Sequence, residues 1–364
     1  MRLWQCPGPA RLLSAAADAL VEGRSAVLRC PALAPPEPEG ELRDVLGATG
    51  WSLMRVEDDG AAPARQVLEA AWVRDALAGE ASAGILLDRA ELSGRVFWCV
   101  PSDAAGVRRW LSFLDDYAVA CRARPDTDGP RFALSLAGAL ACPAPPRTVQ
   151  REVFDLGAAV SQTDLLLLAY HQTGTTFGGA MKGQVIAQTA ASIALWDAQL
   201  LARLLAEPAG VLFNPAGMLA AYGRELGWQP GTASWQDGSE RTIGGSVETH
   251  AALLALEGDP RNVIASRVWA GQAAVLLPAI ERRRFELIAD HEAALRQCLP
   301  FETDFETITD VHDLQVGHVY AVLRKLRLEG PAGRALRIKK ARDSLAHLEP
   351  LTPADAFAAE ILGE

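Results

Sequence analysis

Lysine is scarce in this chain, and paired cysteines and long apolar runs are absent. Only four of the 364 residues are lysine, at positions 182, 325, 339 and 340, so arginine supplies nearly all of the positive side chains. The formal net charge is −10. This charge argues against attraction of nucleic acid over the whole surface, so any RNA contact would need a local basic patch.

The pattern of cysteines and apolar residues excludes several further classes. No two cysteines form a Cys-x-x-Cys pair, so a zinc site is not indicated, and we expect neither a metal nor a cofactor. The longest apolar run, residues 165–170, is far too short to span a bilayer, and no apolar run follows a basic start. We therefore expect a soluble, cytoplasmic protein with reduced thiols and no membrane partner.

Residues 1–160 alternate between short apolar runs and helical patterns. The runs are continuous in hydrophobicity, as in strands that are covered on both faces. Strands are predicted at residues 25–30, 51–56, 95–100, 132–136 and 149–156. Strands that alternate with helices predict an α/β domain with a parallel sheet and helices on both faces.

From residue 161 onward the pattern is almost entirely helical. We expect a helical middle region and linker over residues 161–246, with the glycine-rich stretch 227–245 as the linker. Residues 247–364 are expected to form an all-α bundle, with no sheet in residues 250–364. Its helices are predicted at residues 247–257, 260–277, 278–298, 312–328 and 334–349.

The loop after the first strand, residues 31–41 (PALAPPEPEGE), lacks the groups of a phosphate-binding loop. It has no lysine for the phosphates and no serine or threonine for magnesium. Its prolines remove backbone N–H donors, and Glu37, Glu39 and Glu41 would repel phosphate. Asp103, after the third strand, is either a displaced Walker B acid or the first residue of the next helix. We expect neither ATP binding nor ATP hydrolysis.

The order of elements in residues 8–160 resembles the ATPase core of AAA+ and STAND proteins without its catalytic residues. The resemblance rests on topology and not on a motif. It implies a P-loop-NTPase-like fold with no functional Walker A motif. An ordinary α/β domain that never bound nucleotide is the alternative.

Near the end of the sequence, Arg342 and His347 lie in one helical pattern. An imidazole can take the proton of a ribose 2′-hydroxyl, and a guanidinium can stabilise the charge that gathers on a phosphorane. Asp343 is four residues before His347, on the same helix face, where its carboxylate would orient the imidazole. Arg342 and His347 are about 140° apart around an ideal helix, so they do not converge within one straight helix.

This string resembles the Arg-x4–6-His motif of HEPN-type ribonucleases, and the resemblance covers about residues 250–364. It implies metal-independent RNA cleavage by a homodimer, with Arg342, Asp343 and His347 in the catalytic site. The neighbouring basic residues either bind RNA phosphates or form a solvated helix face: they are Arg334, Arg337, Lys339 and Lys340. His318 is either structural or lines the same cleft.

Two functions stay open at this point. A degenerate STAND-like domain joined to a HEPN-like bundle resembles proteins of bacterial conflict and phage-defence systems. The chain is then either a metal-independent endoribonuclease effector or a non-catalytic scaffold that binds other proteins of the same system. A basic cleft that holds Arg342 and His347 would favour the nuclease. Arg342 tied to a buried acid, with His347 out of solvent, would favour the scaffold.

Overall fold

The computed structural model describes residues 2–34, 38–73, 82–125, 127–174, 180–243, 245–303 and 306–363. The chain divides into two compact units. The α/β unit comprises residues 1–164 and 232–250, and the helical unit comprises residues 165–231 and 251–364. Residues 232–250, which we call the return segment, thus belong to the α/β unit although the helical unit flanks them in sequence on both sides.

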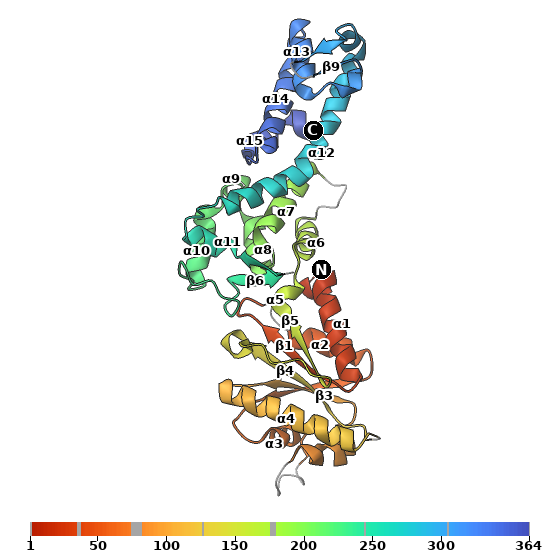
Figure 1. Ribbon diagram of the computed structural model, residues 1–364, viewed down its shortest axis with the longest axis vertical. Coiled ribbons are helices and arrows are strands. Elements are labelled where there is room, and N and C mark those ends of the chain that lie inside the picture. The colour runs from red at the N-terminus through yellow and green to blue at the C-terminus, as the bar shows by residue number, and fades with distance from the viewer. Residues whose placement is uncertain are drawn as a thin grey trace. The chain divides into compact units, whose positions relative to one another are not determined.

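A five-stranded parallel sheet forms the centre of the α/β unit (Figure 1). Its strands are β1 (Ser25–Cys30), β2 (Ser52–Glu57), β3 (Arg95–Val100), β4 (Arg131–Ala137) and β5 (Arg151–Asp155). They lie in the order β2-β3-β4-β1-β5, with Ala26 of β1 opposite Ala133 of β4 and Ser52 of β2 opposite Arg95 of β3. Placement of β4 between β1 and β3 gives a P-loop-NTPase-like sheet, so the predicted α/β fold class is confirmed.

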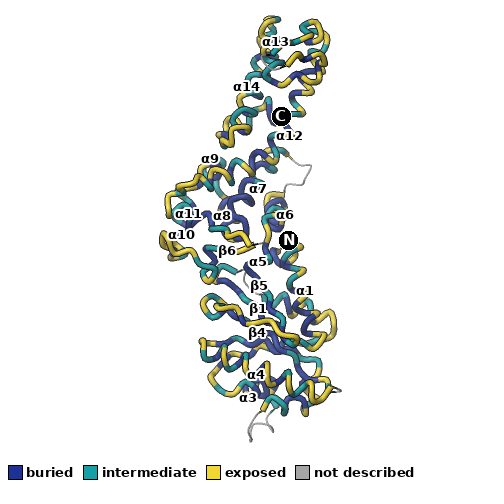
Figure 2. The backbone as a smooth tube through the Cα atoms, viewed as in Figure 1, coloured by how far each residue is buried: buried dark blue, intermediate teal, exposed yellow. Residues whose placement is uncertain are grey.

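Helices cover both faces of this sheet because its strands carry apolar residues on both sides. Most residues of the strands are accordingly buried or partly buried (Figure 2). One face packs against α1 and α2, with Leu13, Leu28 and Leu42 in the shared core. The other packs against α3 and α4, with Phe97, Trp110 and Phe132 in the core. The helices of this unit are α1 (Pro7–Val21), α2 (Pro38–Gly47), α3 (Pro63–Ala70), α4 (Ala104–Ala123) and α5 (Leu156–Ala159), with short 3₁₀ turns at Leu3–Gln5, Ala83–Asp88, Ala90–Leu92 and Gly138–Ala141.

The return segment contains an antiparallel hairpin where a linker was expected. Strands β6 (Glu240–Ile243) and β7 (Ser246–Thr249) pair with each other. The Arg241 guanidinium is buried, pairs with Glu248 at 2.7 Å and donates to the carbonyl oxygen of Val160 at 2.7 Å. These contacts hold the segment on the α/β unit.

The helical unit is built around the long helix α12 (Val263–Arg296), which packs against α7 and α14. Its other helices are α6 (Gln162–Thr173), α7 (Met181–Ala194), α8 (Ala198–Ala206), α9 (Ala209–Leu212), α10 (Ala216–Glu225), α11 (Ala251–Leu256), α13 (Val316–Lys325), α14 (Glu329–Ala346), α15 (Pro353–Ala356) and α16 (Ala359–Leu362), with a 3₁₀ turn at Val311–Asp313. The expectation that residues 250–364 contain no sheet is wrong in one detail. Strands β8 (Phe301–Glu302) and β9 (Thr307–Ile308) form a two-residue hairpin.

The two helices predicted at 260–277 and 278–298 are a single helix. Pro278 lies inside α12 and does not end it, and the backbone instead kinks at His291, where φ is −127°. Among the described helices, α12 is the one with the length and apolar character to cross a bilayer. Its residues Val268, Leu276 and Ile280 are buried within the helical unit, as in the core helix of a globular fold.

Candidate functional site

Helix α14 carries the motif residues, and its local sequence explains how it is held. Ala335, Ile338, Ala341 and Leu345 recur at helical spacing and are buried, so this face packs on α12 and α13. The opposite face is left to solvent. Leu348, three residues after Leu345, does not continue this buried face and is 62% exposed.

The exposure of Leu348 follows from where the helix stops. α14 ends at Ala346, His347 is its C-cap, and Leu348 adopts φ of +62°. The N–H of Glu349 then donates to the carbonyl oxygen of Ser344 at 2.9 Å, which reverses the chain. His347 is therefore exposed and does not belong to the packed face of the helix.

The end of α14 borders an open groove of about 560 Å³. Side chains of α12 fix both of its walls. Trp269 donates to the carbonyl oxygen of Leu345 at 2.7 Å, and the Gln272 amide makes two hydrogen bonds with the backbone of Leu351. The groove is lined by Arg337, Lys340, Ala341, Asp343, Ser344, His347, Glu349, Leu351, Asp355, Ala358 and Ile361.

Arg342 does not line this groove with His347. Its guanidinium donates to Oε1 of Gln315, just before α13, at 3.5 Å and lies 3.8 Å from Oδ1 of Asp343. The two motif residues therefore diverge, as their spacing on a helix requires. His318 lies near Gln315, as Arg342 does. Its Nδ1 accepts from the N–H of Gln315 at 3.2 Å, and its ring lies 5.1 Å from that of Phe301.

Asp343 forms an ion pair with a lysine in this structure. Nζ of Lys339 lies 2.5 Å from Oδ2 of Asp343, one helical turn away. The carboxylate borders the same groove as His347. Its predicted role in orienting that imidazole stays a prediction.

Two of the four residues of the predicted basic patch are paired with acids. Arg337 contacts Glu360 at 2.7 Å, and Lys339 contacts Asp343. Lys340 is exposed and lines the groove, as do Glu349 and Asp355. The groove thus carries both signs of charge, which is unlike the single positive sign that a phosphate backbone attracts.

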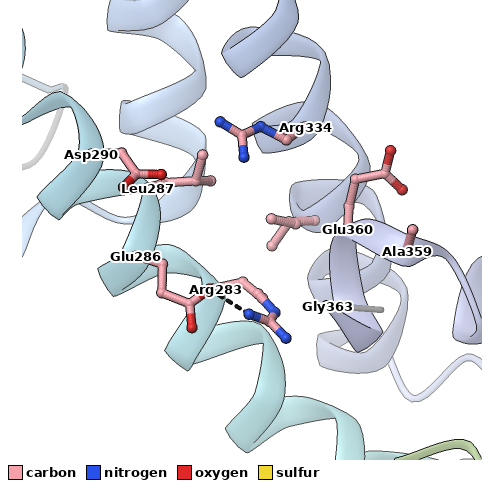
Figure 3. Close-up of a pocket in the computed structure, with 9 residues that line it drawn as sticks. Arg283, Glu286, Leu287, Asp290, Arg334, Ala359, Glu360 and Gly363 are labelled. Atoms are coloured by element: carbon pink, nitrogen blue, oxygen red, sulfur yellow. Dashed lines mark hydrogen bonds and ion pairs between the residues drawn. The ribbon is translucent and has the colours of Figure 1, made fainter.

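Arg334 faces a smaller cavity of about 270 Å³ between α12, α14 and α16 (Figure 3). At its edge, Arg283 and Glu286 form an ion pair at 2.5 Å between neighbouring turns of α12. Arg283 also donates to the carbonyl oxygen of Leu362 at 2.8 Å, which satisfies the end of α16. Asp290 and Glu360 complete a lining of mixed charge.

The carboxyl edge of the parallel sheet is the place where folds of this kind bind ligands. Within residues 31–41, positions 35–37 lie outside the described residues. The described part of the loop is covered by the return segment: the N–H of Ala32 donates to the carbonyl oxygen of Gln236 at 2.8 Å, and Leu33 packs on Gly238. In the described part of the loop, the Ala32 amide therefore bonds to another part of the chain.

Side chains occupy the start of the following helix. Glu39, in the first turn of α2, pairs with Arg43 at 2.7 Å and also with Arg55 of β2. Glu41 pairs with Arg2 at 2.8 Å. A carboxylate is favourable beside a helix N-terminus, so Glu39 takes the electrostatic place that a phosphate would have there. Glu39, Arg43 and Arg55 border an open cavity of about 510 Å³.

Asp103 is the N-cap of α4 and accepts from the N–H of Gly106 at 2.6 Å, so it is not a displaced Walker B acid.

Sequence reasoning missed the acid at the neighbouring strand end. The side chain of Asp58, directly after β2, is fully buried and accepts hydrogen bonds from Arg109, Gln66 and Ser102. An acid two residues after the predicted strand 51–56 was the available signal. Burial alone would raise its pKa, but these bonds and that from Gly60 hold the pKa at about 2.

Among the described residues, no three histidine, cysteine or acidic side chains lie close enough together to hold a metal ion. All six cysteines have free thiols.

The chain matches no known family model, and no curated protein is similar to it in sequence. Among solved structures, it is similar to a Signal Transduction ATPase with Numerous Domains (STAND) protein with a tetratricopeptide repeat sensor from Pyrococcus horikoshii. The alignment covers 93% of this chain at 11% identity, with a TM-score of 0.30. This chain spans 56% of the length of that protein. The fold assignment therefore rests on the strand order of the sheet.

Proposed function

We propose that this chain is a nucleotide-independent scaffold or adaptor of a bacterial signalling or defence system. In this proposal it acts in the cytoplasm, and its helical unit binds other proteins of the system. The observation that carries the proposal is the covered loop after β1. The sheet has the strand order of a P-loop ATPase, but the described part of its loop is bonded to the return segment, and its next helix carries a glutamate in its first turn in place of a phosphate ligand.

Two features of the loop support this reading independently. The amide of Ala32 is already hydrogen-bonded to Gln236, so binding a phosphate there would require that bond to break. Glu39 places a negative charge at the start of α2, held by Arg43 and Arg55. A polyphosphate would have to displace this carboxylate or suffer its repulsion.

We expect the full-length protein to bind neither ATP nor ADP with a dissociation constant below about 100 μM, which corresponds to roughly −5.5 kcal/mol. Isothermal titration calorimetry with magnesium measures this directly. Thermal unfolding should also be unchanged by millimolar nucleotide, since a ligand of the folded state raises its stability. Binding tighter than that limit would refute nucleotide independence.

A metal-independent endoribonuclease is the second candidate, favoured by the exposure of His347 beside Asp343 and Lys340 on the groove. In this proposal His347 acts as the general base or acid, and Asp343 orients its ring. Arg342 would have to come from a second copy of the chain, because within one copy it turns toward Gln315. RNA phosphates would then meet Lys340 and, after their acids are displaced, the remaining basic residues of α14: Arg334, Arg337 and Lys339.

If this candidate is right, the protein cleaves single-stranded RNA in EDTA, and His347→Ala and Arg342→Ala each remove most of the activity. The two losses should not add, because the residues act as one unit. Mixing the two variants should restore part of the activity if the site is shared between two copies. His312→Ala changes an exposed histidine of the same unit and serves as the control.

The adaptor proposal prevails if the wild-type protein leaves RNA intact, alone and with the proteins encoded beside it. It also prevails if His347→Ala cleaves as fast as the wild type. Circular dichroism of each variant separates loss of chemistry from loss of folding.

A further inference from the structure

We propose that the return segment is a latch that closes the carboxyl edge of the sheet, and that its opening, in place of nucleotide exchange, changes the helical unit. This inference rests on the nucleotide-independent function proposed above. It concerns three groups of contacts, which lie at β1, at the loop after β1 and at the two ends of the segment.

The first group surrounds the end of β1. Arg29 is largely buried; its guanidinium lies 4.2 Å from the centre of the Trp235 ring and 3.3 Å from the carboxylate of Asp155. Its Nε donates to the carbonyl oxygen of Ala141 at 2.9 Å. An arginine stacked on an indole and paired with an acid is a specific contact, since the planar guanidinium matches both partners.

The second group lies on the loop itself. The Ala32 N–H to Gln236 bond joins it to the return segment, and Gly238 adopts φ of +81° where it meets Leu33. A Cβ atom at position 238 would lie 2.4 Å from the Cβ of Leu33. The close approach therefore requires glycine, both for space and for conformation.

The third group connects the segment to the helical unit. The segment continues into that unit at residues 231 and 251. There the N–H of Gly231 donates to the carboxylate of Glu257 at 3.0 Å, and Gly223 of α10 packs closely on Leu256 of α11. The two exits of the return segment are thus bound to one helix pair, so movement of the segment acts on α10 and α11 together.

Hydrogen exchange of the full-length protein, with and without Trp235→Ala, tests the latch. The variant removes the indole that covers Arg29 and keeps the β1 strand unchanged. We expect amide exchange in residues 31–34, where Ala32, Leu33 and Ala34 carry an N–H and Pro31 does not, to rise about tenfold or more, because local opening sets the exchange rate of such amides. Exchange in α10 and α11 should rise with it, while that in β3 and β4 stays at the wild-type rate.

A matched control exists in the same unit. An arginine also stacks on Trp51, where the guanidinium of Arg131 lies 5.2 Å from the ring centre. Trp51, however, lies before β2 and away from the loop after β1. Trp51→Ala should leave exchange in residues 31–34 unchanged. Arg29→Lys, which keeps the charge but loses the planar stacking group, should reproduce the effect of Trp235→Ala and covers the case in which that variant folds poorly.

Three results would overturn the proposal. If exchange in residues 31–34 stays at the wild-type rate in both variants, the contacts of the return segment do not protect the loop after β1. A rise throughout the sheet would make the segment a structural part of the unit. If the exchange rate rises in the loop but not in α10 and α11, the return segment is not coupled to these two helices. ATP binding to the wild-type protein would instead refute the proposed function and leave the exchange results as they are.

Discussion

Gly271→Ala is expected to lower the free energy of unfolding of the helical unit by about 2 kcal/mol. Helices α12 and α7 lie very close together at this residue. A Cβ atom there would lie 2.4 Å from the Cα and 2.8 Å from the backbone nitrogen of Thr189. Backbone atoms cannot rotate away as a side chain can, so the helices must separate, and the packing around them is lost. Urea denaturation followed by circular dichroism measures the change.

Gly333→Ala is the matched control, because Gly333 lies inside α14 with no atom within 4 Å of the Cβ position. There alanine should raise stability by about 0.5–1 kcal/mol through its higher helix propensity. Opposite signs at two helical glycines of one unit would identify close packing as the cause. Equal effects at the two positions would contradict the predicted clash.

Asp58→Asn is expected to destabilise the α/β unit by about 2 kcal/mol at pH 7, since the pKa of about 2 lies below the usual 3.8. A lowered pKa means that the ionised carboxylate adds stability, which is fully present above pH 3.8 and is lost as the pH falls through 2. The wild-type and variant proteins should therefore converge toward pH 2. Urea denaturation at several pH values between 2 and 7 tests this.

The control for Asp58 is Asp103→Asn, which replaces one good N-cap residue of α4 with another. It should change stability little at any pH. A pH-independent loss for Asp58→Asn would show that the hydrogen-bond geometry and not the charge matters. Gly106 borders the same carboxylate, where a Cβ atom would lie 2.0 Å from Oδ2, so the network also depends on a residue with no side chain.

The candidate site could be predicted only in part, because some of its features depend on local spacing and others on contacts between distant residues. The helix around Arg342 and His347 follows from local apolar spacing, and so does the divergence of the two side chains. The groove does not, because the segments that line it are held by Trp269 and Gln272, which bond to residues 345 and 351, 76 and 79 positions away. Nor does the pairing of Arg337 with Glu360, which removes one predicted phosphate ligand.

The sequence by itself determined the alternation of strands and helices, the parallel α/β class and the absence of a lysine, serine or threonine in the loop at 31–41. These properties depend on side-chain type and on periodicity within a few residues. Only the tertiary structure decided that the return segment covers that loop, that Arg342 turns toward Gln315 and that α12 continues through Pro278. Each of these depends on contacts between distant residues or on packing that overrides local propensity, and local patterns do not encode either.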